Sequence, residues 1–253
     1  MTGVSLLNAL CYGWIIIAII VHFVMFRVTA PFGRHTSSQW GPVMNNKLGW
    51  FLMELPSLAI MVWFLLNGHA FESHAWILFV CWIIHYANRT LIYPLRIRST
   101  PKPIPVMIVL SAVLFNLVNA GTNGWYLAQA HPDDYSDAWL TSPHFITGAL
   151  LFIVGMAINW RADGILIALR KPGEIAYRIP RGFLFDRVSS PNLFGEVVEW
   201  TGFALMAWNL PALTFAIWTY ANLVPRAKNH HDWYRKHFTD YPSERNIIFP
   251  GIY

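Results

Sequence analysis

The hydrophobic residues of this chain gather into long runs, and the polar residues gather into the short segments between them. Five runs are plain, over residues 6–26, 49–66, 75–93, 106–128 and 145–169. Each is close to the ~20 residues that an α-helix needs to cross a bilayer. Because lipid offers no partner to an unpaired backbone amide or carbonyl group, each run is predicted to be a membrane-spanning helix.

A sixth apolar region, residues 193–224, is too long for one ordinary span. The segment Trp208-Asn209-Leu210-Pro211 divides it, and proline interrupts a helix. The alternatives are one kinked helix and two short spans.

The basic residues decide between these alternatives, because cytosolic loops carry an excess of Lys and Arg. With the N-terminus outside, the segments predicted to be cytosolic carry Arg27, Arg34 and Lys47, then Arg96, Arg98 and Lys102, then Arg170, Lys171, Arg178, Arg181 and Arg187. The segments predicted to lie outside, around residues 68–74 and 129–144, carry no Lys or Arg. The basic tail, residues 225–253, therefore belongs inside, which requires an odd number of spans. We predict one all-α membrane domain over residues 1–253, with seven transmembrane helices, an outside N-terminus and a cytosolic C-terminus.

Composition supports the membrane class and limits the classes of function. Only 12% of the residues are charged, whereas a soluble domain is about a quarter charged. The formal net charge of +5 is compatible with nucleic-acid binding. However, the basic residues form no stripe on a soluble domain, so no nucleic-acid partner is expected. Cys11 and Cys81 lie inside apolar runs, where cysteine packs like a small apolar residue, so no disulfide and no metal site are predicted.

Polar residues inside the spans are the first candidates for function. Glu54 lies in the second span, and Tyr86 and Arg89 lie near the inner end of the third, at a similar depth. An intramembrane carboxyl group is unfavourable in lipid and usually faces a bundle interior or a cavity. The alternatives are a protonated Glu54 bonded to a neighbouring helix, an ordinary core or interface tyrosine, and an arginine that reaches the membrane surface.

Two further pairs of polar residues lie at the inner ends of predicted spans. Asn159 and Asp163 are four residues apart and share a helix face, and so do Asn192 and Glu196. Ser190 is the predicted N-cap of the sixth span, directly before a proline at the first helical position. The free N–H groups of that helix end favour a phosphate or a polar amide. The alternative is that these residues pair across helices.

Residues 159–200 contain both pairs and, between them, a basic loop interrupted by Gly and Pro residues. We interpret this loop as the cover of an anionic cofactor at the mouth of a membrane pocket; the alternatives are the positive-inside signal alone and a contact with lipid head groups. The chain contains no G-x-G-x-x-G, Walker, C-x-x-C or H-E-x-x-H motif. Its adjacent histidines, His230 and His231, do not supply the ligand boxes of a di-iron site.

An acid and a phenol in an apolar cavity suit an apolar substrate that carries one carbonyl group. Glu54 and Tyr86 can both donate to the carbonyl oxygen while negative charge develops on it. An apolar setting keeps the Glu54 carboxyl group protonated, so that it can act as a donor. A dinucleotide would supply the hydride.

Five stretches of the sequence resemble the steroid 5α-reductase (3-oxo-5α-steroid 4-dehydrogenase) family, and the resemblance extends over nearly the whole chain. They are GWFLMELPS, HYANRTLIYP, RKPGEIAYRIPRGFLF, SSPNLFGEVVEW and RAKNHHDWYRKHFTDYPSERNIIFP. The resemblance implies a seven-helix membrane enzyme that binds NADPH on the cytosolic side and reduces the Δ4 double bond of a 3-oxo-Δ4-steroid such as testosterone or progesterone. Hydride goes to C5, the C3 carbonyl is polarised to an enolate, and C4 is then protonated.

The resemblance also implies roles for individual residues. Glu54 and Tyr86 fall on the carbonyl-polarising pair. The cofactor-binding positions are Asn159, Asp163, Arg170, Tyr177, Arg178, Asn192, Glu196, Arg226, His230 and Tyr234. The residues expected at the substrate are Trp50, Met53, Arg89 and Trp200. The cytosolic segments, residues 94–105, 169–191 and 225–253, are expected to cap the cofactor.

One position departs from the family pattern. Mammalian members have Gln where this chain has Met53. A different placement of the steroid and a preference for another enone lipid are therefore both open alternatives.

Two other classes of function remain as alternatives. A membrane methyltransferase that uses S-adenosylmethionine on an isoprenoid or phospholipid would share the basic, His-containing tail, but methyl transfer needs no buried acid pair. A non-catalytic lipid-binding or channel protein would need no loop suited to phosphate. We expect a steroid or another apolar enone and membrane lipid as partners, and no obligate protein partner. The chain is expected to be a bacterial homologue in the cytoplasmic membrane, or to lie in the endoplasmic reticulum membrane if it is eukaryotic.

Overall fold

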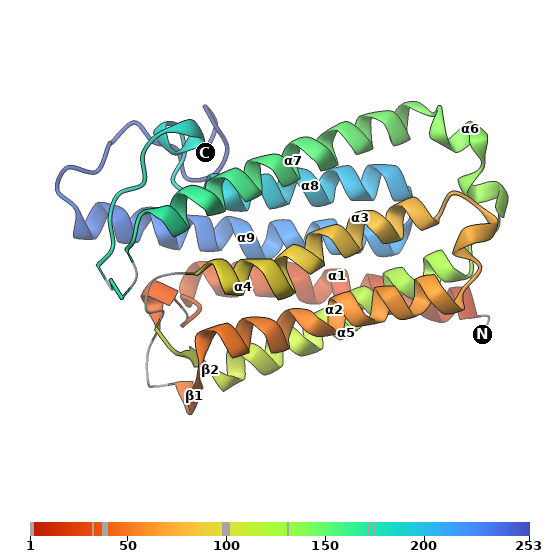
Figure 1. The fold of residues 1–253 in the computed structure, drawn as a ribbon, viewed down its shortest axis with the longest axis horizontal. Helices are drawn as coiled ribbons and strands as arrows, with labels where there is room; N and C mark the ends of the chain where they lie inside the picture. The colour runs from red at the N-terminus through yellow and green to blue at the C-terminus, as the bar shows by residue number, and fades with distance from the viewer. Residues whose placement is uncertain are drawn as a thin grey trace.

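The computed structural model describes residues 3–31, 33–36, 40–97, 102–130, 132–171, 173–174 and 176–253. Its long helices lie side by side along the long axis of the molecule (Figure 1). The α-helices are α1 (Gly3–Arg27), α2 (Asn46–Asn67), α3 (Trp76–Ala87), α4 (Tyr93–Arg96), α5 (Val106–Ala128), α6 (Asp137–Leu140), α7 (Pro143–Ala168), α8 (Pro191–Ala207) and α9 (Leu210–His237). The predicted helical class is confirmed. Arg98, assigned above to the second cytosolic loop, lies outside the described residues.

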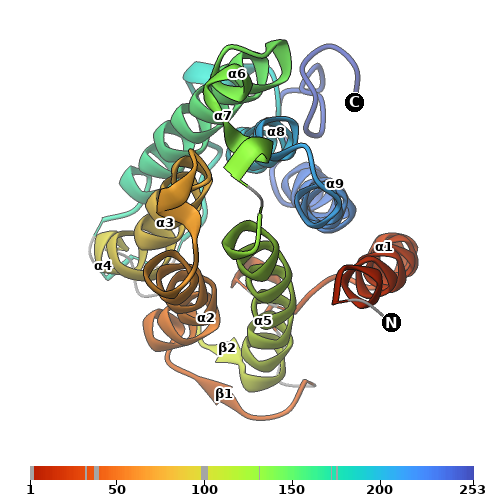
Figure 2. The same ribbon diagram turned by 90° about the vertical axis from the view of Figure 1, so that its right-hand side faces the viewer.

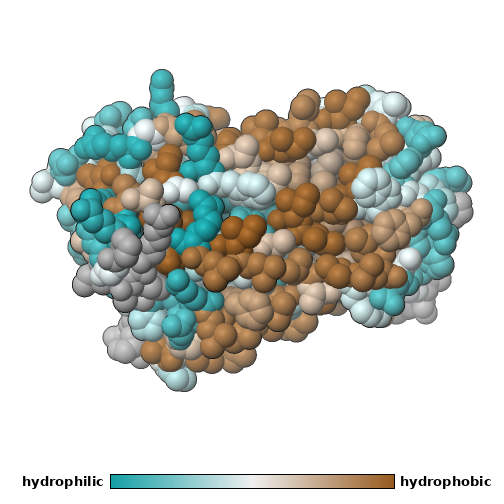
Figure 3. Space-filling view, viewed as in Figure 1, coloured by the Kyte–Doolittle hydropathy of each residue, from teal (hydrophilic) through white to brown (hydrophobic). Residues whose placement is uncertain are grey.

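The helices α1, α2, α5 and α7 are each long and apolar enough to cross a membrane, and they coincide with four of the predicted runs. The remaining run, residues 75–93, forms α3, a π-helical turn over Asn88–Ile92 and the beginning of α4 in one continuous rod. On the face shown in Figure 3, hydrophobic side chains cover the middle of the molecule and hydrophilic side chains gather at its two ends. This distribution is that of a membrane protein whose ends lie in water.

The sixth apolar region is divided at the predicted segment. α8 ends at Ala207, and Trp208 has a left-handed backbone conformation with a φ of 47°. The Asn209 side chain then caps α9 by accepting a 2.9 Å hydrogen bond from the Ala212 amide. The proline that follows lies in the first turn of α9, where no helical hydrogen bond is lost. α8 and α9 therefore run side by side in opposite directions (Figure 1), and the alternative of one kinked helix is wrong.

Helices α7 and α8 form the most extensive helix pair of the molecule. A Cβ atom added to Gly155 of α7 would lie 2.3 Å from the Glu199 backbone nitrogen, and one added to Gly195 of α8 would lie 2.5 Å from the Asn159 backbone nitrogen. Only glycine permits this contact between two helix backbones. The close approach holds the inner end of α7 against the first turns of α8, where the two polar pairs lie.

The loops after α1, α4 and α7 and the tail gather at the end of the bundle that holds the C-terminus (Figure 1). There β1 (Val43–Met44) pairs antiparallel with β2 (Ile104–Pro105). Val188 and Asn246 form a parallel bridge between the loop after α7 and the tail. We call this end, made of the described residues of 28–45, 97–105, 169–190 and 238–253, the cap.

Candidate active site

Two cavities lie inside the bundle and meet there. An apolar cavity of about 480 Å³ is lined by side chains of α1, α2, α3, α5, α8 and α9. Figure 2 shows α1 standing apart from α5, and residues of both helices line this cavity. A polar cavity of about 210 Å³ lies between the helix ends and the cap. The residues that line both cavities are Trp50, Arg89, Glu196, Leu223 and Arg226.

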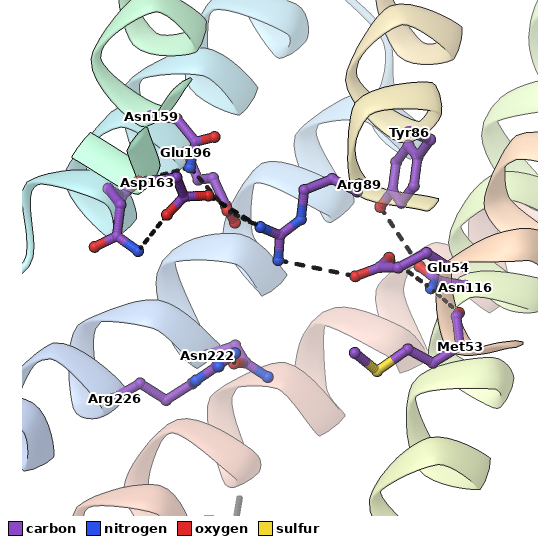
Figure 4. Close-up of polar contacts among 11 residues, drawn as sticks. Met53, Glu54, Tyr86, Arg89, Asn116, Asn159, Asp163, Glu196, Asn222 and Arg226 are labelled. Atoms are coloured by element: carbon purple, nitrogen blue, oxygen red, sulfur yellow. Dashed lines mark hydrogen bonds and ion pairs between the residues drawn. The ribbon is translucent and has the colours of Figure 1, made fainter. Parts of the chain in front are cut away.

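The predicted acid and phenol, Glu54 and Tyr86, both line the apolar cavity. They come from α2 and α3, and Asn116 of α5 connects them (Figure 4). The Tyr86 hydroxyl donates to Asn116 Oδ1 at 3.4 Å, and Asn116 Nδ2 lies 3.3 Å from Glu54 Oε2. The same Nδ2 donates to the Met53 carbonyl oxygen at 2.6 Å. Asn116 therefore ties the two candidate donors to the backbone of α2, and the Met53 side chain lines the cavity beside them.

Arg89 lies at the junction of the two cavities, in the π-helical turn (Figure 4). Its Nη1 is 3.5 Å from Asp163 Oδ2 and 3.7 Å from Glu196 Oε1, and its Nη2 is 3.9 Å from Glu54 Oε1. The guanidinium group also lies over the Trp50 ring, 4.5 Å from its centroid. The alternative that Arg89 reaches the membrane surface is wrong, since it points inward and its side chain is only 13% exposed. One cation thus links the acid of the apolar cavity to the two carboxylates of the polar cavity.

The pairs at the inner ends of α7 and α8 interlock. Asn159 Nδ2 donates to Glu196 Oε1 at 3.0 Å and to the Asn192 carbonyl oxygen at 3.1 Å, and Asn192 Nδ2 donates to Asp163 Oδ1 at 3.1 Å. These residues therefore pair across the two helices. Three of them also line the polar cavity, whereas Asn159 is fully buried behind them. Ser190 is the N-cap residue as predicted, but its side chain makes no capping hydrogen bond to a described residue.

Cationic side chains dominate the polar cavity. Its described wall carries the basic residues Arg34, Arg89, Lys102, Arg170, Arg178 and Arg226, against the carboxylates of Asp163 and Glu196. The predicted cofactor residues in this wall are Asp163, Arg170, Tyr177, Arg178, Asn192, Glu196, Arg226, His230 and Tyr234. The wall therefore draws on α7, α8, α9 and the loop after α7. This donor set suits a ligand with several negative charges.

Arg34 joins this set although no role was predicted for it. Its guanidinium group lies over the rings of Tyr234, Trp233 and Tyr177, at 4.4, 4.9 and 5.4 Å from their centroids. Its Nη2 donates to the Tyr234 hydroxyl at 3.2 Å, while Nη1 is buried and hydrogen-bonds to none of the described residues. Burial and the neighbouring arginines lower the pKa of His35, the next residue, from 6.5 to about 4. The cap side of the cavity is thus strongly electropositive.

A second buried acid–base pair borders the apolar cavity, and the sequence reasoning missed it. His85 Nδ1 of α3 lies 2.8 Å from Glu199 Oε1 of α8. His85 lines the cavity directly beside Tyr86, and Trp200 packs edge-on against the His85 ring at 4.7 Å. Trp200 itself lies in the cavity wall, where the resemblance placed it.

Comparison with known proteins shows which family this arrangement belongs to. A profile of the family described as 3-oxo-5-alpha-steroid 4-dehydrogenase matches residues 102–253. The chain is 39% identical to 3-oxo-5-alpha-steroid 4-dehydrogenase 1 of Bos taurus over 252 residues, which cover 98% of this chain and 97% of the relative. It is 40% identical to Steroid 5-alpha-reductase DET2 of Gossypium hirsutum over 243 residues, 94% of each chain. The chain belongs to the steroid 5-alpha-reductase family.

Membership of this family makes the chain an oxidoreductase, which implies a nicotinamide cofactor. It confirms the resemblance and disfavours the methyltransferase and the non-catalytic alternatives. A third relative, 3-oxo-5-alpha-steroid 4-dehydrogenase 1 of Mus musculus, is 42% identical over 251 residues, 98% of this chain and 97% of the relative. These relatives are from mammals and a plant, so a bacterial origin stays a prediction.

Two signals in the sequence could have revealed the residues that were missed. Asn116 is one of three asparagines, with Asn119 and Asn123, at helical spacing in an apolar run. Such a row of amides predicts a polar face toward a partner or a cavity. Glu199 is a further intramembrane carboxyl group, one turn after Glu196, and the same unfavourable burial that marks Glu54 marks it as a candidate.

Proposed function

We propose that this reductase uses NADPH to reduce the Δ4 double bond of a 3-oxo-Δ4-steroid to the 5α-dihydrosteroid. The observation that carries the proposal is the meeting of an apolar cavity that holds an acid and a phenol with a cavity rich in basic residues. A carbonyl substrate in the first and a polyanionic cofactor in the second are brought together at Trp50 and Arg89. The names of the relatives, which describe steroid 5-alpha-reductases, support the same reaction.

The steroid carbonyl is proposed to lie against Glu54 and Tyr86. Asn116 Nδ2 contacts Glu54 Oε2, and Arg89 Nη2 lies 3.9 Å from Oε1, which is longer than a hydrogen bond and leaves Oε1 able to donate to the substrate. The hydrogen bond from Tyr86 to Asn116 is long, at 3.4 Å, so the phenol can exchange it for the carbonyl oxygen. A neutral Glu54 and Tyr86 then donate two hydrogen bonds to the oxygen on which enolate charge develops, which lowers the barrier to hydride addition at C5.

The donor set of the polar cavity suits the phosphates and the nicotinamide of NADPH, which are proposed to bind there. The cofactor supplies the hydride when it is bound. Arg34, Lys102, Arg170 and Arg178 of the cap are proposed to hold its phosphate groups, and the excess of cations supports NADPH over NADH. Nearer the steroid, Asp163, Asn192 and Glu196 are proposed to bind the polar part of the nucleotide, positioned from behind by Asn159.

The proposed orientation is the seven-helix topology inferred from the basic residues, with an outside N-terminus and the cap in the cytosol. Within the described residues, four helices are apolar and long enough to span a membrane. Three further passes are proposed for the rod of α3, the π-helical turn and α4, for α8 and for α9. α8 has 17 residues and α9 has 28, the last of which carry the basic residues of the tail. The membrane is the cytoplasmic membrane of a bacterium, or that of the endoplasmic reticulum if the chain is eukaryotic.

The identity of the steroid depends on Met53. Gln at this position in mammalian members can hydrogen-bond the substrate or the nicotinamide, whereas Met53 offers only a buried apolar side chain to the cavity. Other enone lipids are therefore included as test substrates alongside testosterone and progesterone.

The test is an anaerobic incubation of the detergent-solubilised protein with progesterone or testosterone and with deuterated NADPH. The deuterium is at C4 of the nicotinamide ring, in the 4R form in one reaction and in the 4S form in the other. Deuterium at C5 of a 5α-dihydrosteroid, delivered from one of the two forms only, is the expected result. NADPH binding without reduction of any steroid would contradict the assignment of a steroid substrate and would redirect the search to other enone lipids. Absence of NADPH binding would contradict the proposal as a whole.

A further inference from the structure

The buried pair of His85 and Glu199 has no part in the mechanism above, although it borders the same cavity. Glu199 is fully buried and His85 is 3% exposed. Their 2.8 Å contact joins α3 to α8 across 114 residues of sequence. Two ionisable groups are unfavourable in a membrane bundle unless they stabilise one another or perform a function.

The geometry leaves one side of the imidazole for the cavity. Glu199 engages Nδ1, and within the part of the chain that the structure describes no group hydrogen-bonds to Nε2. The second carboxylate oxygen, Glu199 Oε2, is buried and likewise has no partner among the described residues. His85 is thus the group that compensates the Glu199 charge, and it does so best as an imidazolium ion. A carboxylate at one ring nitrogen orients the imidazole and stabilises its protonated form, which makes the opposite nitrogen a proton donor.

The position of His85 matches the place where the reaction needs a proton. Its ring lies 5.1 Å, centroid to centroid, from the ring of Tyr86, the residue proposed to bind the C3 oxygen. The carbon that must be protonated, C4, is bonded directly to C3. In the proposed pose, with the C3 oxygen at Glu54 and Tyr86, C4 faces the part of the wall that carries His85.

A second histidine in an apolar helix, His22, has an environment that differs from that of His85. His22 of α1 also lies in an apolar helix, but its Nδ1 bonds to a backbone carbonyl oxygen, that of Ala221, at 3.1 Å. It hydrogen-bonds to no carboxylate among the residues that the structure describes and is absent from the described walls of both cavities. His22 is therefore the matched control for a histidine with a structural role.

We propose that His85 is the general acid that protonates C4 of the steroid enolate, and that Glu199 is its positioning residue. This inference rests on the proposed function. After hydride has reached C5 with its electron pair, the C4=C5 π electrons have moved to C3=C4 and the negative charge lies on the C3 oxygen. The enolate C4 then takes the proton from His85 Nε2, the C3=O double bond reforms, and the N–H electron pair stays on a neutral imidazole. Solvent returns the proton to His85 before the next turnover, so that the reaction consumes one proton overall.

The experiment compares the full-length wild-type protein with His85→Gln, Glu199→Gln and His22→Gln in D2O, using unlabelled NADPH and testosterone. The position and face of the deuterium in the product are read by NMR and mass spectrometry. Steroid affinity in the presence of NADP⁺ and the unfolding temperature of each variant are measured in parallel. These two readouts do not depend on turnover and separate a catalytic role from a structural one.

The wild type and His22→Gln are expected to place deuterium on one face of C4. In His85→Gln, hydride still adds to C5 but solvent supplies the proton, so both faces are labelled. Turnover falls on the order of 100-fold, the lower end of what a general acid contributes, while steroid affinity stays within about twofold. Glu199→Gln keeps the hydrogen bond and loses the charge, so it is expected to change in the same direction by less.

Single-face labelling in His85→Gln, with turnover like that of the wild type, would overturn the inference while leaving the proposed function intact. If His85→Gln does not fold, Glu199→Gln is the deciding variant. Lower turnover with a changed solvent isotope effect would support the inference, and wild-type values of both would overturn it. A wild type that binds NADPH and reduces no steroid would instead overturn the substrate assignment, and the inference with it.

Discussion

The sharpest consequence of the site geometry concerns Asn116, which holds the two candidate donors in place. Asn116→Ala removes the 2.6 Å bond to the Met53 carbonyl oxygen and the longer contacts to Glu54 and Tyr86, at 3.3 and 3.4 Å. A net hydrogen bond contributes about 1 kcal/mol, and the long contacts contribute less, so the expected loss of stability is roughly 1–3 kcal/mol. The larger effect is on geometry, because a misplacement of about 1 Å costs on the order of 100-fold in rate.

The assay measures kcat and KM for steroid reduction together with nucleotide affinity. Asn116→Ala is expected to lower kcat by roughly 10- to 100-fold, since both donors lose their anchor, and to leave nucleotide affinity unchanged. Asn119→Ala is the control, because Asn119 lies one turn away, accepts from Trp14 Nε1 at 3.3 Å and is not in the described wall of the apolar cavity. Equal losses of kcat in the two variants would refute the reasoning, because they would show a general effect on the bundle.

Four other predictions can be checked with the same protein. Glu54→Gln and Tyr86→Phe are each expected to lower kcat by roughly 100-fold or more, as for the loss of an oxyanion donor, with nucleotide affinity retained in a binding titration; normal turnover would remove that residue from the mechanism. Arg170→Ala is expected to weaken NADPH binding about tenfold by loss of a charge-assisted hydrogen bond, and unchanged affinity would contradict its assignment. Gly155→Val is expected to abolish folding or lower the unfolding temperature strongly, because its Cβ would lie 2.3 Å from the α8 backbone; a wild-type unfolding temperature would show that the helices can separate. The fourth concerns His35, whose pKa is lowered from 6.5 to about 4 in the folded protein. Because the unfolded state then binds protons preferentially, the stability is expected to fall as the pH decreases from 6.5 toward 4. His35→Gln should reduce this pH dependence of the unfolding temperature, and an unchanged pH profile would contradict the prediction.

The sequence by itself determined the elements and their order. Lipid requires each long apolar run to satisfy its own backbone hydrogen bonds, so helices followed from hydropathy and length alone. The division at residues 208–211 was also predictable, since Asn209 caps a helix and the next proline begins one. The depth of Glu54 and Tyr86 followed from counting along their spans, and the cofactor positions that the resemblance implied line the polar cavity, except Asn159.

Only the tertiary structure decided which residues touch. Helix periodicity gives the face of a residue, but not the neighbour which that face meets. The contact of Asn159 with Glu196 depends on the glycines that let α7 and α8 approach. Arg89 could have reached the membrane surface, and the fold instead turned it toward three carboxylates contributed by three different helices.

The residues that the sequence did not reveal share one physical property: their partners are remote in the chain. Asn116 and Tyr86 are separated by 30 residues, Asn116 and Glu54 by 62, His85 and Glu199 by 114, and Arg34 and its tyrosine partner by 200. Local hydropathy and motif spacing contain no information about such distances. Backbone hydrogen bonding within each span is a local requirement that the sequence expresses directly, whereas the active site is produced by packing between spans, which depends on all of them together.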